Sequence, residues 1–195
     1  DNLVNGTLKL IPKKAKFLNS DISDEDKVSK LLKNNQFDII IHFAAYTKVG
    51  ESVEFPEKYI DNNFNKAKIF LNTCIEHGLN KIIFSSTGSV YGNVSKENIL
   101  ETDNTAPINP YSESKLKFEK HLELLSKEKV CSSIILRYFN VAGADKDLRS
   151  GLLTNPDNLI KAICEVATKK REKLIINGKG YKTKDGTTIR DFIHV

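Results

Sequence analysis

The feature that most constrains the fold is a series of short apolar runs, each separated from the next by a segment with helical periodicity. The longest runs are DIIIHF (38–43), KIIFSS (81–86) and SSIILRYFN (132–140). Continuous β-branched runs of this kind are typical of strands buried on both faces of a parallel sheet. Shorter strands are expected at KAKFLNSDI (14–22), KLIING (173–178) and RDFIHV (190–195).

Helices are expected between these runs, at 24–35, 56–78, 109–125 and 156–170. The second begins at Pro56 and ends at Gly78, residue types that favour the first turn and the end of a helix. Strands that alternate with helices of this length form parallel βαβ units, so the predicted fold is α/β with a doubly wound parallel sheet. Beyond about Gly143 the alternation becomes irregular, which predicts a boundary there.

Composition excludes several classes of protein. The 195 residues are 39% hydrophobic and 28% charged, as in a globular domain, and the net charge of +5 is spread along the chain, which favours a solvated surface over a nucleic-acid site. No apolar run approaches the roughly 20 residues that span a bilayer. The three cysteines are isolated, as in reduced cytoplasmic proteins without a metal site. The chain has no methionine and ends in a strand-like run, so we expect it to be truncated at both ends.

Ligands of open α/β sheets bind beyond the carboxyl ends of the strands. Four segments that follow predicted strands are rich in small or polar residues: 21–22, 42–52, 85–92 and 137–144. We therefore expect these four segments to line a ligand-binding cleft.

The helix predicted at 109–125 places two chemically active side chains at its start. Tyr111, Lys115, Phe118, Leu122 and Leu125 are spaced 4, 3, 4 and 3, which puts them on one helix face. A tyrosine that acts as a base near neutral pH needs its pKa lowered from about 10 to about 7, roughly 4 kcal/mol. An ammonium about 6 Å away contributes roughly 2.8 kcal/mol at an effective dielectric near 20. Alternatively, Lys115 only extends its stem along a half-buried tyrosine.

Thr87 follows a predicted strand and adds a hydroxyl that could bind an oxygen deprotonated by Tyr111. This order of strand, Ser/Thr loop and Tyr-x-x-x-Lys helix resembles the extended short-chain dehydrogenase/reductase family, in particular its nucleotide-sugar 4-epimerases. The resemblance extends over essentially the whole chain, through IIHFAA, VGES, YIDNNFN, SSTGSVYG, PYSESK, LRYFNVAGA and DGTTIRDFIHV.

The resemblance implies a Rossmann-like NAD(P)-binding fold and the interconversion of UDP-galactose and UDP-glucose through a 4-keto intermediate, with tightly bound NAD. Tyr111 would take the proton of the sugar 4-hydroxyl, Lys115 would hold the nicotinamide ribose and lower the Tyr111 pKa, and Thr87 would bind the sugar. The further implied cofactor contacts are Asp1, Asn2, Asp21, Ile22, Phe43, Ala44, Ala45, Asn62, Ser85, Tyr138 and Phe139. The implied UDP-sugar contacts are Asn140, Asn158, Leu159 and Arg190, with Arg190 at the diphosphate.

By the same resemblance, residues 1–143 would form a partial NAD-binding domain and 144–195 the start of a UDP-sugar-binding region. Homodimers would form through the helices that begin at Pro56 and Asn109. The ten glycines include no GxGxxG or GxxGxxG, the family's pyrophosphate-binding loop, so we expect the chain alone to bind NAD poorly. Asn177 replaces an aromatic residue that some relatives place near uracil.

Two other functions remain open. Nucleotide-sugar dehydratases carry Thr-Asp-Glu after the equivalent strand, where this chain has Thr87, Gly88 and Ser89, without either carboxylate. A non-catalytic NAD-binding relative would not need the Thr/Tyr/Lys set. His42 is interpreted as a core histidine and Glu51 as a residue of a helix start, neither of them catalytic.

Overall fold

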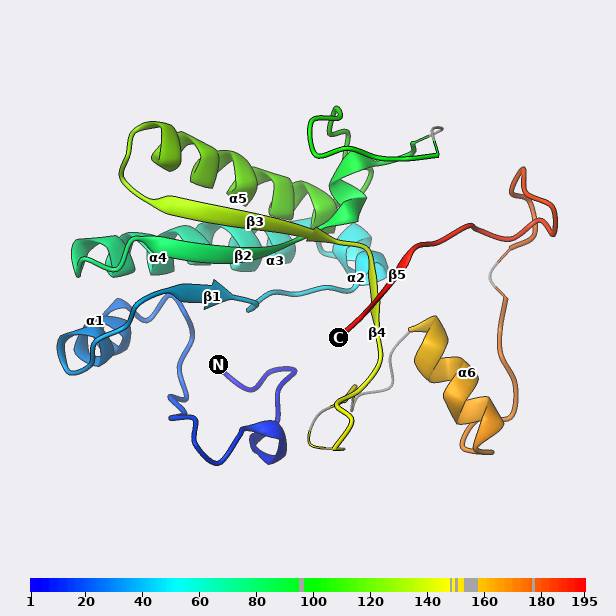
Figure 1. Cartoon of the computed structure of the whole chain (residues 1–195), viewed down its shortest axis with the longest axis horizontal. Helices are drawn as coiled ribbons and strands as arrows, with labels where there is room; N and C mark the ends of the chain where they lie inside the picture. Colours follow the sequence, from blue (N-terminus) through cyan, green and yellow to red (C-terminus); the bar gives the residue numbers. More distant parts are fainter. Residues whose placement is uncertain (95–96, 148, 150, 153–157, 177) are drawn as a thin grey trace. The chain divides into compact units, whose positions relative to one another are not determined.

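The computed structural model describes residues 1–94, 97–147, 149, 151–152, 158–176 and 178–195, and Figure 1 colours them along the chain. Asn177, and residues 156 and 157 of the last predicted helix, lie outside the described part. The described residues divide into two compact units. Unit 1 is Asp1–Gly6 with Lys14–Tyr138, and unit 2 is Thr7–Lys13 with Phe139–Val195.

Unit 1 is built on a parallel sheet of three strands in the order β1-β2-β3. The strands are β1 (Ile40–His42), β2 (Lys81–Thr87) and β3 (Ser132–Tyr138). Ile41 of β1 is opposite Ile83 of β2, which in turn is opposite Ile134 of β3. The parallel α/β sheet that the sequence predicts is therefore confirmed.

The helices of unit 1 are α1 (Glu25–Lys33), α2 (Val49–Glu54), α3 (Pro56–Ile60), α4 (Lys66–Glu76) and α5 (Pro110–Lys127). A 3-10 turn, η3 (Gly88–Tyr91), follows β2. The helix predicted at 56–78 is confirmed, but a π-helical turn, η2 (Asp61–Asn65), separates α3 from α4. Gly78, with a φ of +80°, ends it as predicted, because the left-handed conformation favours glycine.

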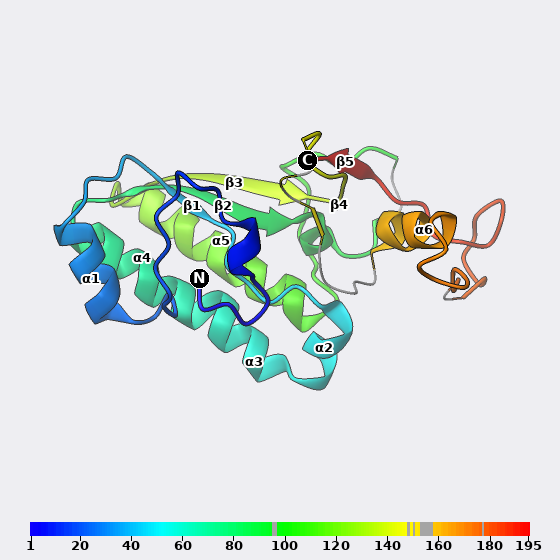
Figure 2. The ribbon, with the colours of Figure 1, turned by 90° about the horizontal axis from the view of Figure 1, so that it is seen from below.

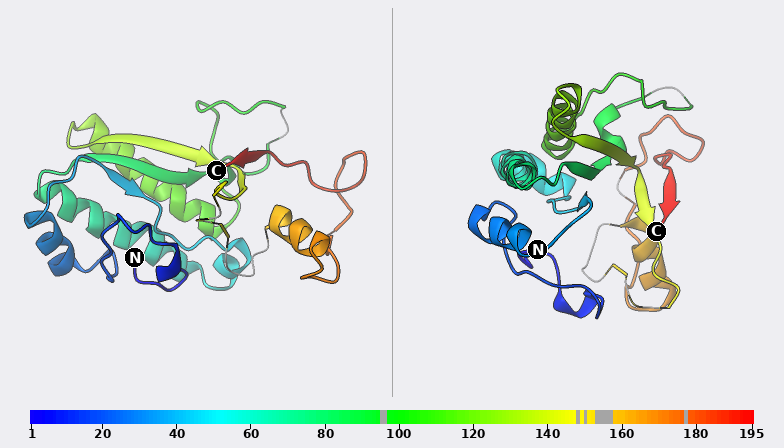
Figure 3. Two further views of the ribbon diagram at one scale, coloured as in Figure 1. Left: turned by 60° about the horizontal axis from the view of Figure 1, so that its bottom comes forward. Right: turned by 60° about the vertical axis from the view of Figure 1, so that its left-hand side comes forward.

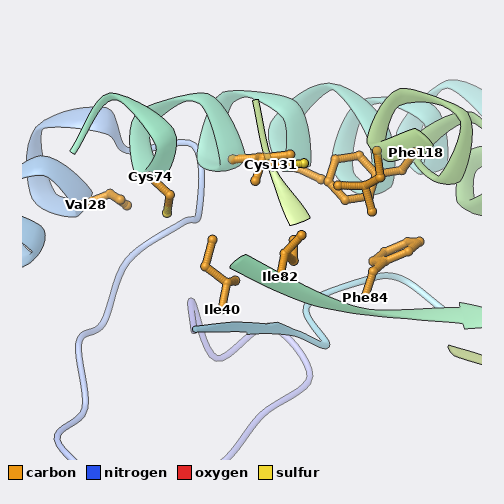
Figure 4. Close-up of a cluster of buried hydrophobic side chains, with 10 residues drawn as sticks. Val28, Ile40, Cys74, Ile82, Phe84, Phe118 and Cys131 are labelled. Carbon is orange, nitrogen blue, oxygen red and sulfur yellow. The ribbon is translucent and has the colours of Figure 1, made fainter. Parts of the chain in front are cut away.

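The core of unit 1 lies between the sheet and one layer of helices, with α1, α4 and α5 on the same face (Figure 2). Ile40, Ile82 and Phe84 point from the strands into this layer, toward Phe118 of α5 (Figure 4). The alternate residues of β1 face away from it, and Ile41 is 56% exposed. The prediction that the strands are buried on both faces is wrong for β1 and for β3, where Ile134 is also 56% exposed, because the described helices of unit 1 cover only one face.

Two predicted strands are absent from the described residues. Residues 14–22 join no sheet, and no ladder includes residues 173–176. An apolar run becomes a strand only where a neighbouring strand completes its backbone hydrogen bonds. The nearest approach to pairing in 14–22 is two bonds with Asp1: the Ser20 amide donates to the Asp1 carbonyl, and the Asp1 amino group donates to the Leu18 carbonyl.

Unit 2 holds a parallel pair of strands, β4 (Asn140–Ala142) and β5 (Phe192–His194), which lie side by side in Figure 3. It also holds α6 (Leu159–Ala167) and a 3-10 turn, η1 (Leu8–Leu10). The strand predicted at 190–195 is thus present over Phe192–His194, and the helix predicted at 156–170 over Leu159–Ala167. None of the described helices combines the length and apolar character needed to cross a membrane.

Candidate active site

The first turn of α5 carries the two residues that the sequence singles out. Asn109 caps the helix, its side-chain oxygen accepting from the Ser112 amide at 2.9 Å, and Pro110 occupies the first helical position. Lys115, Phe118 and Leu122 are buried, and Leu125 packs on the same core, so the predicted face is confirmed. Three polar residues are also buried on α5: Ser112, Ser114 and Glu119.

Lys115 is buried at the end of β2. Only 3% of it is exposed, and its ammonium donates to the Ser85 carbonyl at 2.8 Å and lies 4.9 Å from the centre of the Phe84 ring. Burial lowers the pKa of Lys115 to about 8, although the negative charge of Glu119 acts to raise it. Lys115 is thus a buried cation whose pKa lies close to neutral pH.

Tyr111 is half-buried, and its ring meets that of Tyr59 edge to face at 6.5 Å between centroids. Burial raises the pKa of Tyr111 above its ordinary value, while a hydrogen bond with the Thr87 side chain acts to lower it. The direction is opposite to the lowering expected from Lys115. In the chain by itself, loss of water around the phenol outweighs the neighbouring groups.

Thr87 is the last residue of β2 and is almost fully buried. Its hydroxyl lies 2.9 Å from that of Ser89 and accepts from the Ser89 amide at 3.2 Å, capping η3. The hydroxyls of Thr87, Ser89 and Tyr111 are therefore gathered at the carboxyl end of one strand. This is where parallel sheets bind their ligands.

A pocket in unit 1 brings together seven of the predicted cofactor contacts: Asp1, Asn2, Asp21, Ile22, Ala44, Ala45 and Asn62. It is also lined by Tyr46, which belongs to the predicted 42–52 segment, and by four residues that the sequence did not single out: Val4, Asn5, Gly6 and Ser20. Ser20 adjoins the 21–22 segment, and Val4, Asn5 and Gly6 lie within four residues of Asn2, so proximity to a predicted contact was their available signal. Of the predicted contacts, Phe43, Ser85 and Tyr138 belong to unit 1 but not to this pocket, and Phe43 is 63% exposed.

Asp21 is the centre of a hydrogen-bond network on this pocket. Its carboxylate accepts from the amide and hydroxyl of Ser23 at 3.0 and 2.8 Å and from the Lys66 ammonium at 3.0 Å, and Asn2 donates to it at 3.3 Å. Burial acts to raise the pKa of Asp21, but the bonds from Ser23 and Lys66 prevail and lower it to about 2. Asp21 is therefore anionic at neutral pH.

Asn63, next to the predicted Asn62, holds two elements of the site together. Its amide oxygen accepts from the Tyr46 amide at 2.8 Å, and its amide nitrogen donates to the Tyr46 carbonyl and to the Ser114 hydroxyl. Ser114 in turn donates to the Tyr111 carbonyl at 2.7 Å. The loop after β1 and the first turn of α5 are thus tied to the π-helical turn, a feature often found at functional sites.

The predicted UDP-sugar contacts other than Thr87 lie in unit 2, as does Phe139. The Asn140 side chain donates to the Asp191 carbonyl at 2.9 Å, and Asn158 caps α6 by accepting from the Lys161 amide at 3.1 Å. Leu159 begins α6 and is exposed, and Arg190 is exposed with its Nε donating to Thr188. Their role in binding stays a prediction.

Two residues have the structural roles expected of them. His42 is buried between the rings of Phe70, Phe84 and Phe118, and burial lowers its pKa to about 3, so it is neutral. Glu51 lies in the first turn of α2, where it pairs with Lys58 at 2.7 Å and accepts from the Tyr59 hydroxyl at 2.8 Å.

A parallel α/β sheet with a Tyr/Lys helix at the end of its second strand defines a class of nucleotide-dependent enzymes. The model of the NAD dependent epimerase/dehydratase family matches residues 1–195, and the chain belongs to this family. It is 40% identical over 196 residues to a UDP-glucose 4-epimerase of Lacticaseibacillus casei, a match that covers 100% of the chain and 59% of the relative.

Solved structures agree with this assignment. The crystal structure of a UDP-glucose 4-epimerase superposes with a TM-score of 0.93 at 39% identity, covering 99% of this chain and 59% of that one. The UDP-glucose 4-epimerase of Bifidobacterium longum, solved in complex with NAD+ and UDP, gives 0.87 at 35% identity over 93% and 56%. The Rossmann-like fold is thereby confirmed, and the chain spans little more than half the length of the relatives that it matches.

Proposed function

We propose that the full-length protein is an NAD-dependent UDP-glucose 4-epimerase, interconverting UDP-galactose and UDP-glucose. The observation that carries the proposal is the meeting of Thr87, Tyr111 and Lys115 at the carboxyl end of β2, in a chain 40% identical to a protein of that name. Residues 1–143 would contribute the cofactor-binding part and 144–195 the start of the sugar-binding part.

The pocket at Asp1 fits the nucleoside end of NAD. Ala44 and Ala45 leave room beside it, and the oxygens of Asp1 and Asn2 can accept hydrogen bonds from ribose hydroxyls. Among its described lining residues there is no lysine or arginine, so the pocket suits an uncharged nucleoside better than a diphosphate. When bound, NAD supplies a reversible hydride acceptor for sugar C4.

The side chains of the chain would handle the proton. Tyr111, as phenolate, would remove the proton of the 4-hydroxyl, leaving a 4-keto sugar, and would return it after the sugar has turned over. Lys115 would stabilise the phenolate with its buried charge, and the Thr87 hydroxyl would orient the sugar oxygen. Phe43, Ser85, Tyr138 and Phe139 remain proposed cofactor contacts, and the unit 2 residues proposed UDP-sugar contacts.

Homodimerisation through the helices that begin at Pro56 and Asn109, and a cytoplasmic location, complete the proposal. The location is supported by Cys74 and Cys131, which are buried free thiols. Sedimentation of the full-length protein tests the dimer, since a monomer at micromolar concentration would contradict it.

Conversion of UDP-galactose to UDP-glucose by the full-length protein tests the activity. Tyr111→Phe is expected to lower kcat by about 10²- to 10⁴-fold, the usual contribution of a general base. Tyr181→Phe, at an exposed tyrosine of unit 2, is the matched control and should retain full activity. No conversion by the wild-type protein, or full activity of Tyr111→Phe, would overturn the proposal, and a dehydrated sugar product would indicate the dehydratase alternative.

A further inference from the structure

A buried ion pair lies one helical turn beyond Lys115. Glu119 of α5 is fully buried, and Arg137 of β3 donates to its carboxylate through Nε at 3.1 Å and Nη2 at 2.6 Å. The Ser86 hydroxyl donates to the other carboxylate oxygen. Neither Glu119 nor Arg137 is used by the proposed proton transfer.

Three consecutive residues of β2 connect this pair to the site. The Ser85 carbonyl accepts from Lys115, Ser86 donates to Glu119, and Thr87 supplies the hydroxyl next to Tyr111. Lys115 and Glu119 are four residues apart and share a helix face. The side chain of Glu119 therefore fixes α5 against the same three residues of β2 that the site uses.

Arg137 extends the connection to β3 and to the turn after Thr87. It is opposite Ser86 in the sheet, and its Nη1 donates to the Tyr91 hydroxyl at 2.8 Å and to the Glu101 carbonyl at 3.2 Å. A buried ion pair adds little net stability, because the cost of removing both charges from water offsets their attraction. A role in positioning explains the location of this one better than stability does.

Glu119 also acts on Lys115 electrostatically, through the negative charge of its carboxylate. The ionisable groups near Lys115 in the described structure are Tyr111 and Glu119 on its own helix and His42 on β1. His42 is neutral, because burial lowers its pKa, and burial raises the pKa of Tyr111, which leaves it neutral too. Glu119, itself paired with Arg137 of β3, is then the anion that acts on the Lys115 ammonium.

We propose that Glu119 is a positioning residue for the Thr87–Tyr111–Lys115 site: its buried carboxylate joins α5, one turn beyond Lys115, to the ends of β2 and β3. The inference rests on the proposed function for its effect on turnover. The effect of Glu119 on the Lys115 pKa does not depend on the substrate.

The first experiment measures Lys115 directly. The ¹³Cε signal of Lys115, assigned as the one missing from Lys115→Arg, is titrated by NMR in the full-length protein and in Glu119→Gln. We expect the Lys115 pKa to fall by about one unit in Glu119→Gln, since a nearby opposite charge is lost. Glu113→Gln is the matched control, because Glu113 forms an exposed pair with Lys117 on the same helix at 3.2 Å, and it should leave the titration unchanged.

The second experiment measures turnover against pH. In Glu119→Gln the alkaline limb of the kcat profile should move down by about one pH unit, with kcat at pH 8 about fivefold lower and KM little changed. A residue that only supports the fold would lower stability without moving this limb. If the wild-type protein converts no UDP-galactose, the proposed function fails, and the NMR titration still tests Glu119.

Glu119→Gln leaves the charge of Arg137 without its anionic partner. An unpaired buried charge of this kind is enough to prevent folding. The variant Glu119→Gln/Arg137→Met leaves no unpaired charge and, by removing the same anion, should also lower the Lys115 pKa. Circular dichroism identifies which variants are folded. The proposal would be overturned if either Glu119 variant, once shown to be folded, had the same Lys115 pKa and the same alkaline limb as Glu113→Gln.

Discussion

At the scale of single residues, Lys115 shows most clearly how burial and charge oppose each other. The sequence pattern places a lysine on an apolar helix face, and the structure confirms that it is buried, with its ammonium donating to the Ser85 carbonyl. The fall of its pKa from 10.5 to about 8 corresponds to about 3 kcal/mol that the folded chain spends on holding this charge. Such a cost is expected at a functional site rather than in a structural core.

Lys115→Met should therefore stabilise the protein while removing its activity. Because the native pKa of Lys115 is lower than the unfolded one, the cost is fully present below about pH 8. It decreases as the pH rises from 8 to 10.5 and is absent above 10.5. We expect Lys115→Met to raise the free energy of unfolding by roughly 1–3 kcal/mol at pH 7, and less at pH 10. Urea unfolding at both pH values measures this, with the exposed Lys117→Met as control. An equal or lower stability of Lys115→Met at pH 7 would contradict the prediction.

Thr87 provides a test of the hydroxyl alone. Thr87→Val keeps the shape of the side chain but removes the hydroxyl that interacts with Ser89 and Tyr111, and we expect kcat for UDP-galactose to fall by roughly 10²-fold. Thr87→Ser restores the hydroxyl and should retain most of the activity. Equal turnover by the valine and serine variants would show that the hydroxyl has no part in the reaction.

At the scale of secondary-structure elements, α5 carries both a structural and a chemical task. Its cap, Asn109, lies two residues before Tyr111, while Phe118 and Leu122 anchor the rest of the helix to the sheet. The helix and its apolar face could be predicted from periodicity, because that signal is local. The π-helical turn that separates α3 from α4 could not, since Asn63 stabilises it through partners as distant as Ser114.

Asn109→Ala should cost about 1 kcal/mol of stability, the usual value of a helix cap, and should also lower kcat because the first turn holds Tyr111. Asp24→Ala is the matched control, since Asp24 caps α1 by accepting from the Lys27 amide at 3.1 Å. It should lose similar stability with unchanged turnover. The prediction fails if both variants keep wild-type kcat.

At the scale of the whole molecule, the chain consists of two compact units, and unit 1 has its own core. Phe118 is fully buried in that core, 4.8 Å from the Phe84 ring and 5.7 Å from His42. Truncating this side chain is expected to leave a cavity between the sheet and α5. Core integrity in unit 1 thus depends on a residue of the same helix that carries the site.

Phe118→Ala is expected to cost about 3–5 kcal/mol in unit 1. Hydrogen exchange should show faster exchange of the β1, β2 and β3 amides, with β4, β5 and α6 little changed. Phe192→Ala, at a partly exposed phenylalanine of unit 2, should leave β1 to β3 protected. Uniform loss of protection across both units in Phe118→Ala would show that they unfold as one.

The sequence by itself determined the parallel α/β class, the starts of α1 and α5 to within one residue, and the Tyr111/Lys115 pair, because hydrophobic period, caps and the Tyr-x-x-x-Lys spacing are all local features. The tertiary structure decided which runs are strands, which face of β1 is covered, and the sign of the Tyr111 pKa shift. It also decided that Glu119 is buried against Ser86 and Arg137. These depend on partners far apart in the chain, and on the loss of water around them, which a local pattern does not contain.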